Sequence, residues 1–134
     1  MIIGIGTDII AVARIGRLIE RNPRFVEKVY SASEQEYCQS KANPAQSYAA
    51  RFAAKEAFMK ALGTGWDEGI CWAEIEVINN DKGKPEIVLR GATLRYFAAR
   101  KLDRIHLSLS HEKEYAIATV IVEGSSAEDP CSGC

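Results

Sequence analysis

Two carboxylates and a lysine in this chain have the surroundings expected of a site that handles phosphate with a metal ion. Glu56 lies in a run of small and apolar residues, 49–62, that is apolar almost all round when wound as a helix. A bare carboxylate there would cost roughly several kcal/mol, so we expect Glu56 to be protonated, ion-paired or bound to a cation. Lys60 follows one turn later on the same stripe, where it either pairs with Glu56 or reaches a phosphate.

The second carboxylate, Asp8, closes the opening segment Ile2–Thr7, which has the alternation of a strand. Gly4, Gly6 and Asp8 share one of its faces. Glycine weakens a strand, so this face is expected to meet another backbone or a ligand, unless the glycines only permit a turn and Asp8 caps the next helix. If the strand lies against the helix of Glu56, the two carboxylates supply hard oxygen ligands of the kind that Mg²⁺ prefers.

The two histidines of the chain are further candidates for the site. Two common catalytic motifs are absent from the sequence. His106 alternates outward on a predicted strand, whereas His111 lies at a turn, where it is either a surface residue or in contact with a ligand. The sequence contains neither a phosphate-binding P-loop motif nor a nucleophile elbow. These absences favour chemistry based on the carboxylates.

Hydrophobic periodicity predicts the elements that must position these residues. Helices are expected at Ile9–Arg21, from about Ser31 to Ala42, from Asn43–Pro44 to a glycine stop at Gly63, and at Gly91–Leu102. Strands are expected at Ile2–Thr7, Ala73–Ile78, Glu86–Leu89, Arg104–Ser110 and Tyr115–Glu123, with a turn at Asn79–Pro85. We therefore predict an α+β domain in which a mostly antiparallel sheet packs on the long central helix.

Charge and composition restrict the classes of partner. Lysine plus arginine is 17 and aspartate plus glutamate is 18, and this net charge of −1 argues against a general nucleic-acid binder. Basic side chains nevertheless share one face of the first helix and continue beyond it, at Arg14, Arg17, Arg21, Arg24 and Lys28. They form either a solvated surface or a dock for an acidic partner.

Domain organisation and location follow from length and hydropathy. The 134 residues suit one domain, which we place at 1–123, followed by a flexible tail at 124–134. Cys131 and Cys134 in that tail have C-x-x-C spacing, but we expect them to be incidental rather than a metal or redox site. No basic region precedes an apolar block at the N-terminus, and no apolar run reaches the roughly 18 residues that span a bilayer, so a cytoplasmic protein without membrane contact is expected.

Two motifs in this order resemble a known family. Gly4-Ile5-Gly6-Thr7-Asp8-Ile9 with Arg14, together with Arg51-Phe52-Ala53-Ala54-Lys55-Glu56-Ala57 and Lys60-Ala61-Leu62-Gly63-Thr64-Gly65, closely resemble the holo-[acyl-carrier-protein] synthases, the short bacterial type of 4′-phosphopantetheinyl transferase. The resemblance extends to the Gly83-Lys84-Pro85 turn and the hairpin 108–116, and covers Met1 to about Glu123. The tail that ends in cysteine departs from the family pattern.

The resemblance implies a reaction and a role for each matching residue. Phosphopantetheine would pass from coenzyme A to a serine of apo acyl carrier protein, releasing 3′,5′-ADP, in a Mg²⁺-dependent step that serves fatty acid biosynthesis. It implies that Asp8 and Glu56 bind the metal and that Lys60 contacts the coenzyme A phosphates. It places the Gly83-Lys84-Pro85 turn and His111 near the nucleotide, and makes Arg14, Arg21 and Arg24 the dock for the carrier protein. It also implies a homotrimer with shared active sites.

Several alternatives stay open from the sequence. The same carboxylates would serve a Mg²⁺-dependent hydrolase of small pyrophosphates, which uses water in place of the carrier serine. The arginine surface alone would serve a non-catalytic module that binds an acidic protein. Either Asp8 or Glu56 could accept the serine proton, and the sequence does not tell which carrier protein is served or whether acyl-coenzyme A is accepted.

Overall fold

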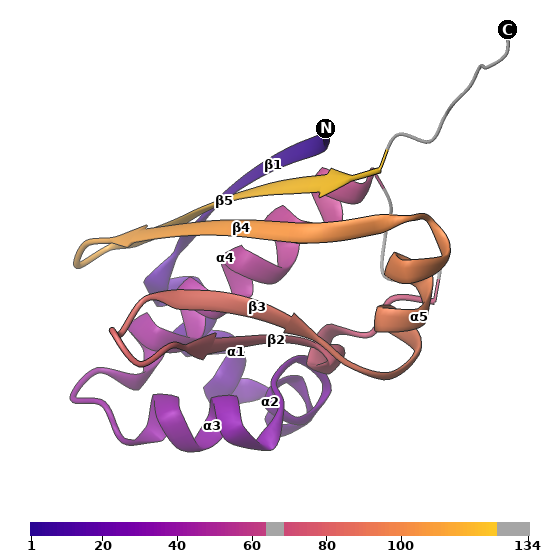
Figure 1. Cartoon of the computed structure of the whole chain (residues 1–134). Coiled ribbons are helices and arrows are strands. Elements are labelled where there is room, and N and C mark those ends of the chain that lie inside the picture. Colours follow the sequence, from indigo (N-terminus) through magenta and orange to yellow (C-terminus); the bar gives the residue numbers. More distant parts are fainter. Residues whose placement is uncertain (64–68, 126–134) are drawn as a thin grey trace, which may run out of the picture.

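Helix α4 (Pro44–Leu62) packs against one face of a three-stranded antiparallel sheet, as Figure 1 shows. This computed structural model describes residues 1–63 and 69–125. The sheet has the strand order β1–β5–β4, and β2 and β3 form a separate antiparallel hairpin. The strands are β1 (Ile2–Ala11), β2 (Ile75–Asn79), β3 (Pro85–Leu89), β4 (Leu102–His111) and β5 (Tyr115–Gly124). The predicted α+β class with an antiparallel sheet on a long central helix is confirmed.

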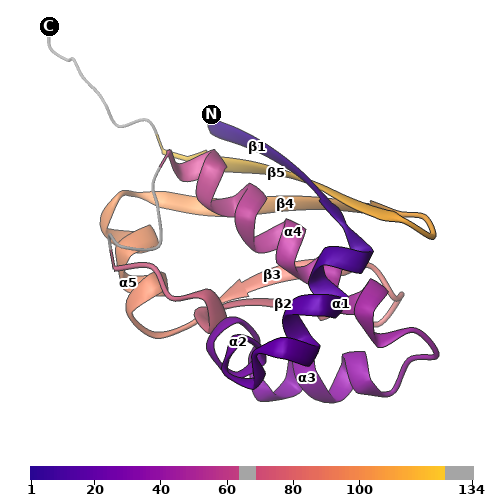
Figure 2. The same ribbon diagram turned by 180° about the vertical axis from the view of Figure 1, so that it is seen from behind.

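Shorter helices complete the domain around α4. They are α1 (Val12–Arg21), α2 (Pro23–Val29), α3 (Ala32–Gln39), the 3₁₀ helix η2 (Trp72–Glu74) and α5 (Gly91–Ala99). In the view from behind, α2 and α3 lie beyond the β2–β3 hairpin, on the side away from the three-stranded sheet (Figure 2). Within the described ranges, no helix is both long and apolar enough to cross a membrane. The predicted tail falls mostly at residues 126–134, outside the described residues, as do Cys131 and Cys134.

The ends of α4 are set by local chemistry that the sequence predicted. The Asn43 side chain accepts a hydrogen bond from the Gln46 amide, and Pro44 occupies the first turn, where its missing N–H is not needed. Gly63 ends the helix in the left-handed conformation, with φ 72°. From Tyr48 to Leu62 every residue except Phe52, Glu56 and Lys60 is buried, which agrees with the expectation of a helix that is apolar almost all round.

The two glycines of β1 let the strand lie directly on α4. A Cβ atom at Gly4 would overlap the carbonyl oxygen of Ala61, and one at Gly6 would overlap the carbonyl oxygen of Ala57. Both obstacles are backbone atoms, so a side chain at either position would push the strand off the helix. The predicted close backbone approach is confirmed, and it brings the next residue on this face, Asp8, up to α4.

Strand β1 is longer than predicted, and this corrects the expected start of the first helix. The backbone of Ile9–Ala11 continues the ladder with β5, and α1 begins only at Val12. Asp8 is therefore a mid-strand residue opposite Ala118, and the alternative that it caps a helix is wrong, because Ala11 is the N-cap residue of α1. Isoleucine is β-branched and fits a strand better than a helix. Pairing with β5 therefore keeps Ile9 and Ile10 in the strand.

Other predicted ends shift by a few residues. Helix α3 starts at the predicted capping box of Ser31 and Glu34 but ends at Gln39, and α5 ends at Ala99. Lys101 then adopts a positive φ of 61°, which turns the chain into β4. The predicted strand Ala73–Ile78 begins later, since η2 occupies its first residues.

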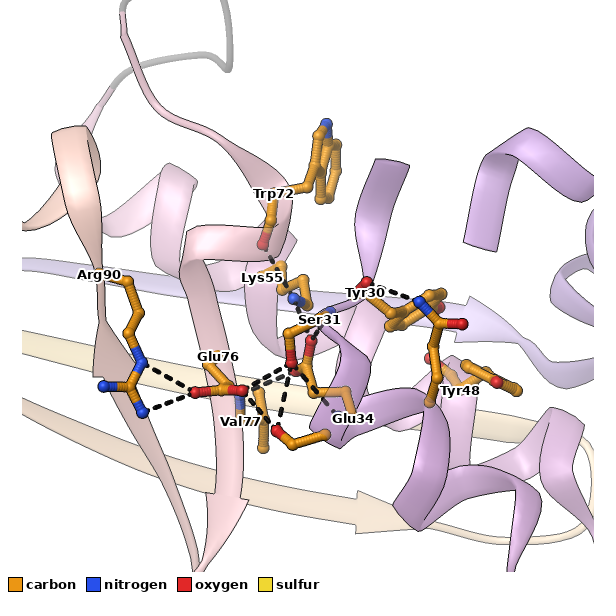
Figure 3. A network of polar contacts seen from close by, with 11 residues as sticks. Tyr30, Ser31, Glu34, Tyr48, Lys55, Trp72, Glu76, Val77 and Arg90 are labelled. Atoms are coloured by element: carbon orange, nitrogen blue, oxygen red, sulfur yellow. Dashed lines mark hydrogen bonds and ion pairs between the residues drawn. The ribbon is translucent and has the colours of Figure 1, made fainter. Parts of the chain in front are cut away.

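A buried ion pair, which the sequence analysis did not predict, ties α3 and β2 to α4 (Figure 3). Lys55 Nζ lies 2.7 Å from Glu34 Oε1, and both side chains are fully buried. Lys55 also donates to the carbonyl of Trp72, while the second Glu34 oxygen accepts the Val77 amide at 2.8 Å. Glu34 thus hydrogen-bonds the edge of β2 that β3 does not cover.

Candidate active site

Lys60 links β1 to α4 at the predicted metal site. Its Nζ lies 3.1 Å from Asp8 Oδ1 and 3.0 Å from the carbonyl oxygen of Thr7. The Asp8 side chain is only 14% exposed, whereas that of Lys60 is 53% exposed and can turn toward a ligand. The alternative of a simple Glu56–Lys60 pair is not what the structure shows, because Lys60 pairs with Asp8.

Glu56 belongs to the same electrostatic cluster. Burial raises the pKa of the Glu56 carboxyl above its ordinary value and the nearby Asp8 raises it further, whereas Lys60 and Arg14 act in the opposite direction. No ion pair or hydrogen bond to Glu56 occurs within residues 1–63 and 69–125. The cluster therefore holds a half-buried carboxylate beside Asp8 that has no ion-pair partner of its own among the residues that the structure describes.

The donor set of this cluster fits Mg²⁺. Burial is the main cause of the raised pKa of Glu56, and repulsion from the Asp8 carboxylate adds to it; a divalent cation would relieve that repulsion. No group of three or more histidine, cysteine, aspartate or glutamate side chains suited to a metal occurs in the part of the chain that the structure describes. One or two carboxylates, with water and phosphate oxygens completing the shell, is the usual protein contribution to a Mg²⁺ site.

A second cluster forms a pocket of about 220 Å³ at the other side of α4. Gly83, Pro85 and His111, which the family resemblance placed near the nucleotide, all line it. Lys84, from the same turn, does not line it and is exposed. Gly83 has φ 82°, so glycine suits this turn, and the Asn79 side chain donates to its carbonyl. The structure thus joins a turn and a strand end distant in sequence.

Arg51 supplies the charge of this pocket, and the sequence analysis gave it no role. It is 5% exposed, its Nη2 donates to Asn79 Oδ1 at 3.0 Å, and its buried Nε has no hydrogen-bond partner within the described residues. An unsatisfied buried guanidinium N–H costs free energy that an anionic ligand would recover. The only sequence signal was its place in the motif, five residues before Glu56.

Comparison with known proteins decides the family. The profile of the 4′-phosphopantetheinyl transferase superfamily matches residues 4–120. The holo-[acyl-carrier-protein] synthase of Geobacter metallireducens is 47% identical over 92% of this chain and 98% of its own length, and that of Koribacter versatilis is 46% identical over 92% and 99%. The chain belongs to the holo-[acyl-carrier-protein] synthases. The family resemblance that the sequence motifs indicated is confirmed.

Solved structures agree with the fold of this synthase. The enzyme from Neisseria meningitidis superposes with a TM-score of 0.85 at 34% identity, covering 92% of this chain and 99% of that one. The enzyme from Bacillus anthracis, solved in complex with coenzyme A (3′,5′-ADP), gives a TM-score of 0.78 at 36% identity, over 93% and 99%. The synthase therefore has the fold of its family over more than nine tenths of its length.

The predicted carrier dock lies next to the carboxylates of the synthase. Arg14, Arg17 and Arg21 project from the exposed face of α1 and line a shallow pocket with Leu18. Arg14 is close enough to Glu56 to lower the pKa of that carboxyl. Arg24 is exposed in the first turn of α2, just beyond this pocket. The basic surface and the carboxylates thus adjoin.

Proposed function

We propose that this holo-[acyl-carrier-protein] synthase transfers 4′-phosphopantetheine from coenzyme A to the carrier serine at the cluster of Asp8, Glu56 and Lys60. The observation that carries this assignment is the contact of β1 with α4, which sets Asp8 beside Glu56, for which the described part of the chain offers no ion-pair partner. Asp8 and Glu56 would hold Mg²⁺, which neutralises charge on the pyrophosphate oxygens when bound. The transferase domain proposed from the sequence, residues 1–123, contains all these groups.

The residues of the chain then have distinct tasks. Lys60 is half-exposed and contacts Asp8, so its ammonium can swing to a phosphate of coenzyme A and offset the charge that develops on the leaving phosphate. The carrier serine is the nucleophile, so no covalent intermediate on the enzyme is needed. Because transfer of a phosphoryl-type group depends mainly on charge and alignment, this small set of side chains suffices.

The pocket on the other side of α4 would take the nucleotide portion. Arg51 brings a buried positive charge, and His111 lies at its rim with Gly83 and Pro85. Since Lys60 and the metal serve the pyrophosphate, the remaining phosphate, on the ribose, is the anion left for Arg51 and His111. Lys84, predicted to take part, would contact the nucleotide only from outside the pocket.

The two clusters do not share a pocket in one chain, which supports a site completed between subunits. None of the cluster of Asp8, Glu56 and Lys60 lines the nucleotide pocket. The outer face of β1 and β5 also exposes large apolar side chains, at Ile3, Ile5, Ile9, Tyr115 and Ile117. An apolar strand face of this kind marks an assembly surface, and we propose the homotrimer on this basis. Arg14, Arg21 and Arg24, on the basic surface of α1 and α2 beside the carboxylates, would dock the acidic carrier protein.

A mass-shift assay tests the carboxylate assignment. The synthase is mixed with coenzyme A, Mg²⁺ and an apo carrier protein, and the carrier is followed by mass spectrometry. Asp8→Ala and Glu56→Ala should each abolish the added phosphopantetheine, as should EDTA, while Asp103→Asn, an exposed carboxylate at the far end of β4, should leave turnover unchanged. Retained turnover in both alanine variants would end the metal-ligand assignment.

The same assay separates the other candidate functions. Release of nucleotide in the absence of any carrier protein would indicate a pyrophosphate hydrolase. Carrier binding that persists in EDTA without any transfer would indicate a binding module. Raising the salt concentration should weaken carrier binding, because exposed charges such as Arg14, Arg21 and Arg24 are screened.

A further inference from the structure

The ring of Tyr37 on α3 lies against the guanidinium of Arg51. The Cζ atom of Arg51 is 4.1 Å from the ring centroid, well within the range of a cation–π contact. Both residues line the nucleotide pocket. Tyr37 is half-buried, and its backbone carbonyl accepts a hydrogen bond from Ser40 Oγ at the end of the helix.

Arg51 has little else to hold it. No carboxylate within residues 1–63 and 69–125 forms an ion pair with it, and its one hydrogen bond goes to the neutral amide of Asn79. A buried guanidinium without a counter-ion can turn about its long side chain unless a surface restrains its plane. The Tyr37 ring supplies that surface, and the Asn79 oxygen fixes the rotation within the plane.

We infer that Tyr37 is a positioning residue that keeps the Arg51 guanidinium ready for the ribose phosphate of the nucleotide. This inference rests on the proposed function of the pocket. The face of the ring stabilises the cation, and the hydroxyl has no part in it. Tyr37 therefore sets the preference of the synthase for a nucleotide that carries this phosphate over one that lacks it.

Calorimetric titration with two nucleotides tests the inference. Adenosine 3′,5′-bisphosphate carries the additional phosphate, and adenosine 5′-monophosphate lacks it, so the ratio of their affinities reports the contact with Arg51. Tyr37→Leu should reduce this ratio about fivefold, because it weakens the binding of the bisphosphate alone. Tyr37→Phe should keep the ratio within about twofold of the wild-type value. If Tyr37 only supported the fold, its loss would weaken the binding of both nucleotides equally and leave the ratio unchanged.

The chain offers a matched control. Tyr96 on α5 is also half-buried and faces an arginine, with Arg100 Cζ 5.4 Å from its ring centroid, but it lies away from the pocket. Tyr96→Leu should leave the ratio at the wild-type value. Should Tyr37→Leu not fold, Tyr37→Met, which keeps much of the side-chain volume without an aromatic face, takes its place with the same expected loss of preference. A loss of preference in Tyr37→Phe would show that the hydroxyl matters and would overturn the inference.

A third variant separates failure of the inference from failure of the pocket assignment. Arg51→Gln should remove the preference for the bisphosphate. If Arg51→Gln keeps the preference, the proposed nucleotide pocket is wrong, and the inference falls with it. If Arg51→Gln loses the preference while Tyr37→Leu keeps it, only the role of Tyr37 is refuted.

Discussion

Replacing Lys55 with methionine should strongly destabilise the synthase, although Lys55 is not assigned to its chemistry. The substitution keeps the length of the side chain but removes the ammonium, which lies 2.7 Å from Glu34 Oε1 and 2.8 Å from the Trp72 carbonyl. The Glu34 carboxylate would then stay fully buried and, among the described residues, would keep only the amides of Ser31 and Val77 as partners. A buried charge would be left without its counter-ion.

The size of the effect follows from this geometry. Breaking a buried ion pair by removing one partner costs about 3–5 kcal/mol, and the two amides that remain on Glu34 place the expected loss near the lower end, at about 3 kcal/mol. A domain has a total stability of about 5–15 kcal/mol, so the variant would lose a substantial part of it. Burial lowers the pKa of Lys55 and the nearby Glu34 opposes this effect, as expected of a buried pair whose attraction works against its own desolvation.

Urea unfolding followed by circular dichroism measures this loss. Lys55→Met should lower the unfolding free energy by about 3 kcal/mol, and Lys82→Met, at an exposed lysine of the β2–β3 turn, should change it by less than about 0.5 kcal/mol. The double variant Glu34→Gln with Lys55→Met should be more stable than Lys55→Met alone, because the neutral amide still accepts one N–H and no charge is left buried. A loss below about 1 kcal/mol in Lys55→Met, or strictly additive losses in the double variant, would refute this account of the pair.

Three further predictions test the packing, an acid-sensitive contact and the assembly. Gly6→Ala should cost about 1–3 kcal/mol in urea unfolding and lower carrier modification, whereas Gly16→Ala, whose Cβ would meet nothing closer than 3.6 Å, should be tolerated. Burial raises the pKa of Glu76, but hydrogen bonds from its neighbours outweigh this effect, and the pKa is lowered from 4.5. The ionised Glu76 therefore stabilises the fold above about pH 4.5, and this contribution is lost as the pH falls through the lowered pKa. The urea midpoint of Glu76→Gln should therefore fall less than that of the wild type as the pH is lowered, and an equal fall in both proteins would contradict this. Ile5→Lys should sediment as a single chain of 14.8 kDa and lose turnover, and an unaltered oligomer would count against the assembly surface.

The sequence predicted those features whose causes are local. Asn43 and Gly63 cap α4 through contacts within a few residues, and both helix ends were predicted. The glycines of β1 indicated a close backbone neighbour because a missing side chain has few other uses in a strand. The length of β1 was underestimated, since the pairing of Ile9 with Ile117 depends on a strand more than 100 residues away in the sequence.

The sequence did not reveal the roles of charges whose partners are distant. Lys55 and Arg51 stand in a recognisable motif, yet their partners are Glu34 and Tyr37 on α3 and Asn79 at the end of β2. Nothing in the local pattern tells a buried lysine from an exposed one, because both fit a helix equally well. Only the packing of α3 and the hairpin against α4 reveals which cation is neutralised and which is left for a ligand.

Three of the four charged residues of α4, Arg51, Lys55 and Glu56, contact different parts of the molecule. Successive helix residues are about 100° apart, so Lys55 and Glu56 point to different sides and Arg51 lies about 140° from Glu56. Lys55 ties the helix to α3 and β2, Glu56 lies near Asp8 of β1, and Arg51 lines the proposed nucleotide pocket. Because a helix turns as a rigid body, the Lys55–Glu34 contact contributes, together with the packing on β1 and β5, to the rotation that aims both of the others. Weakening that one contact under folding conditions should therefore impair metal affinity and bisphosphate preference together, whereas Tyr37→Leu should impair the preference alone.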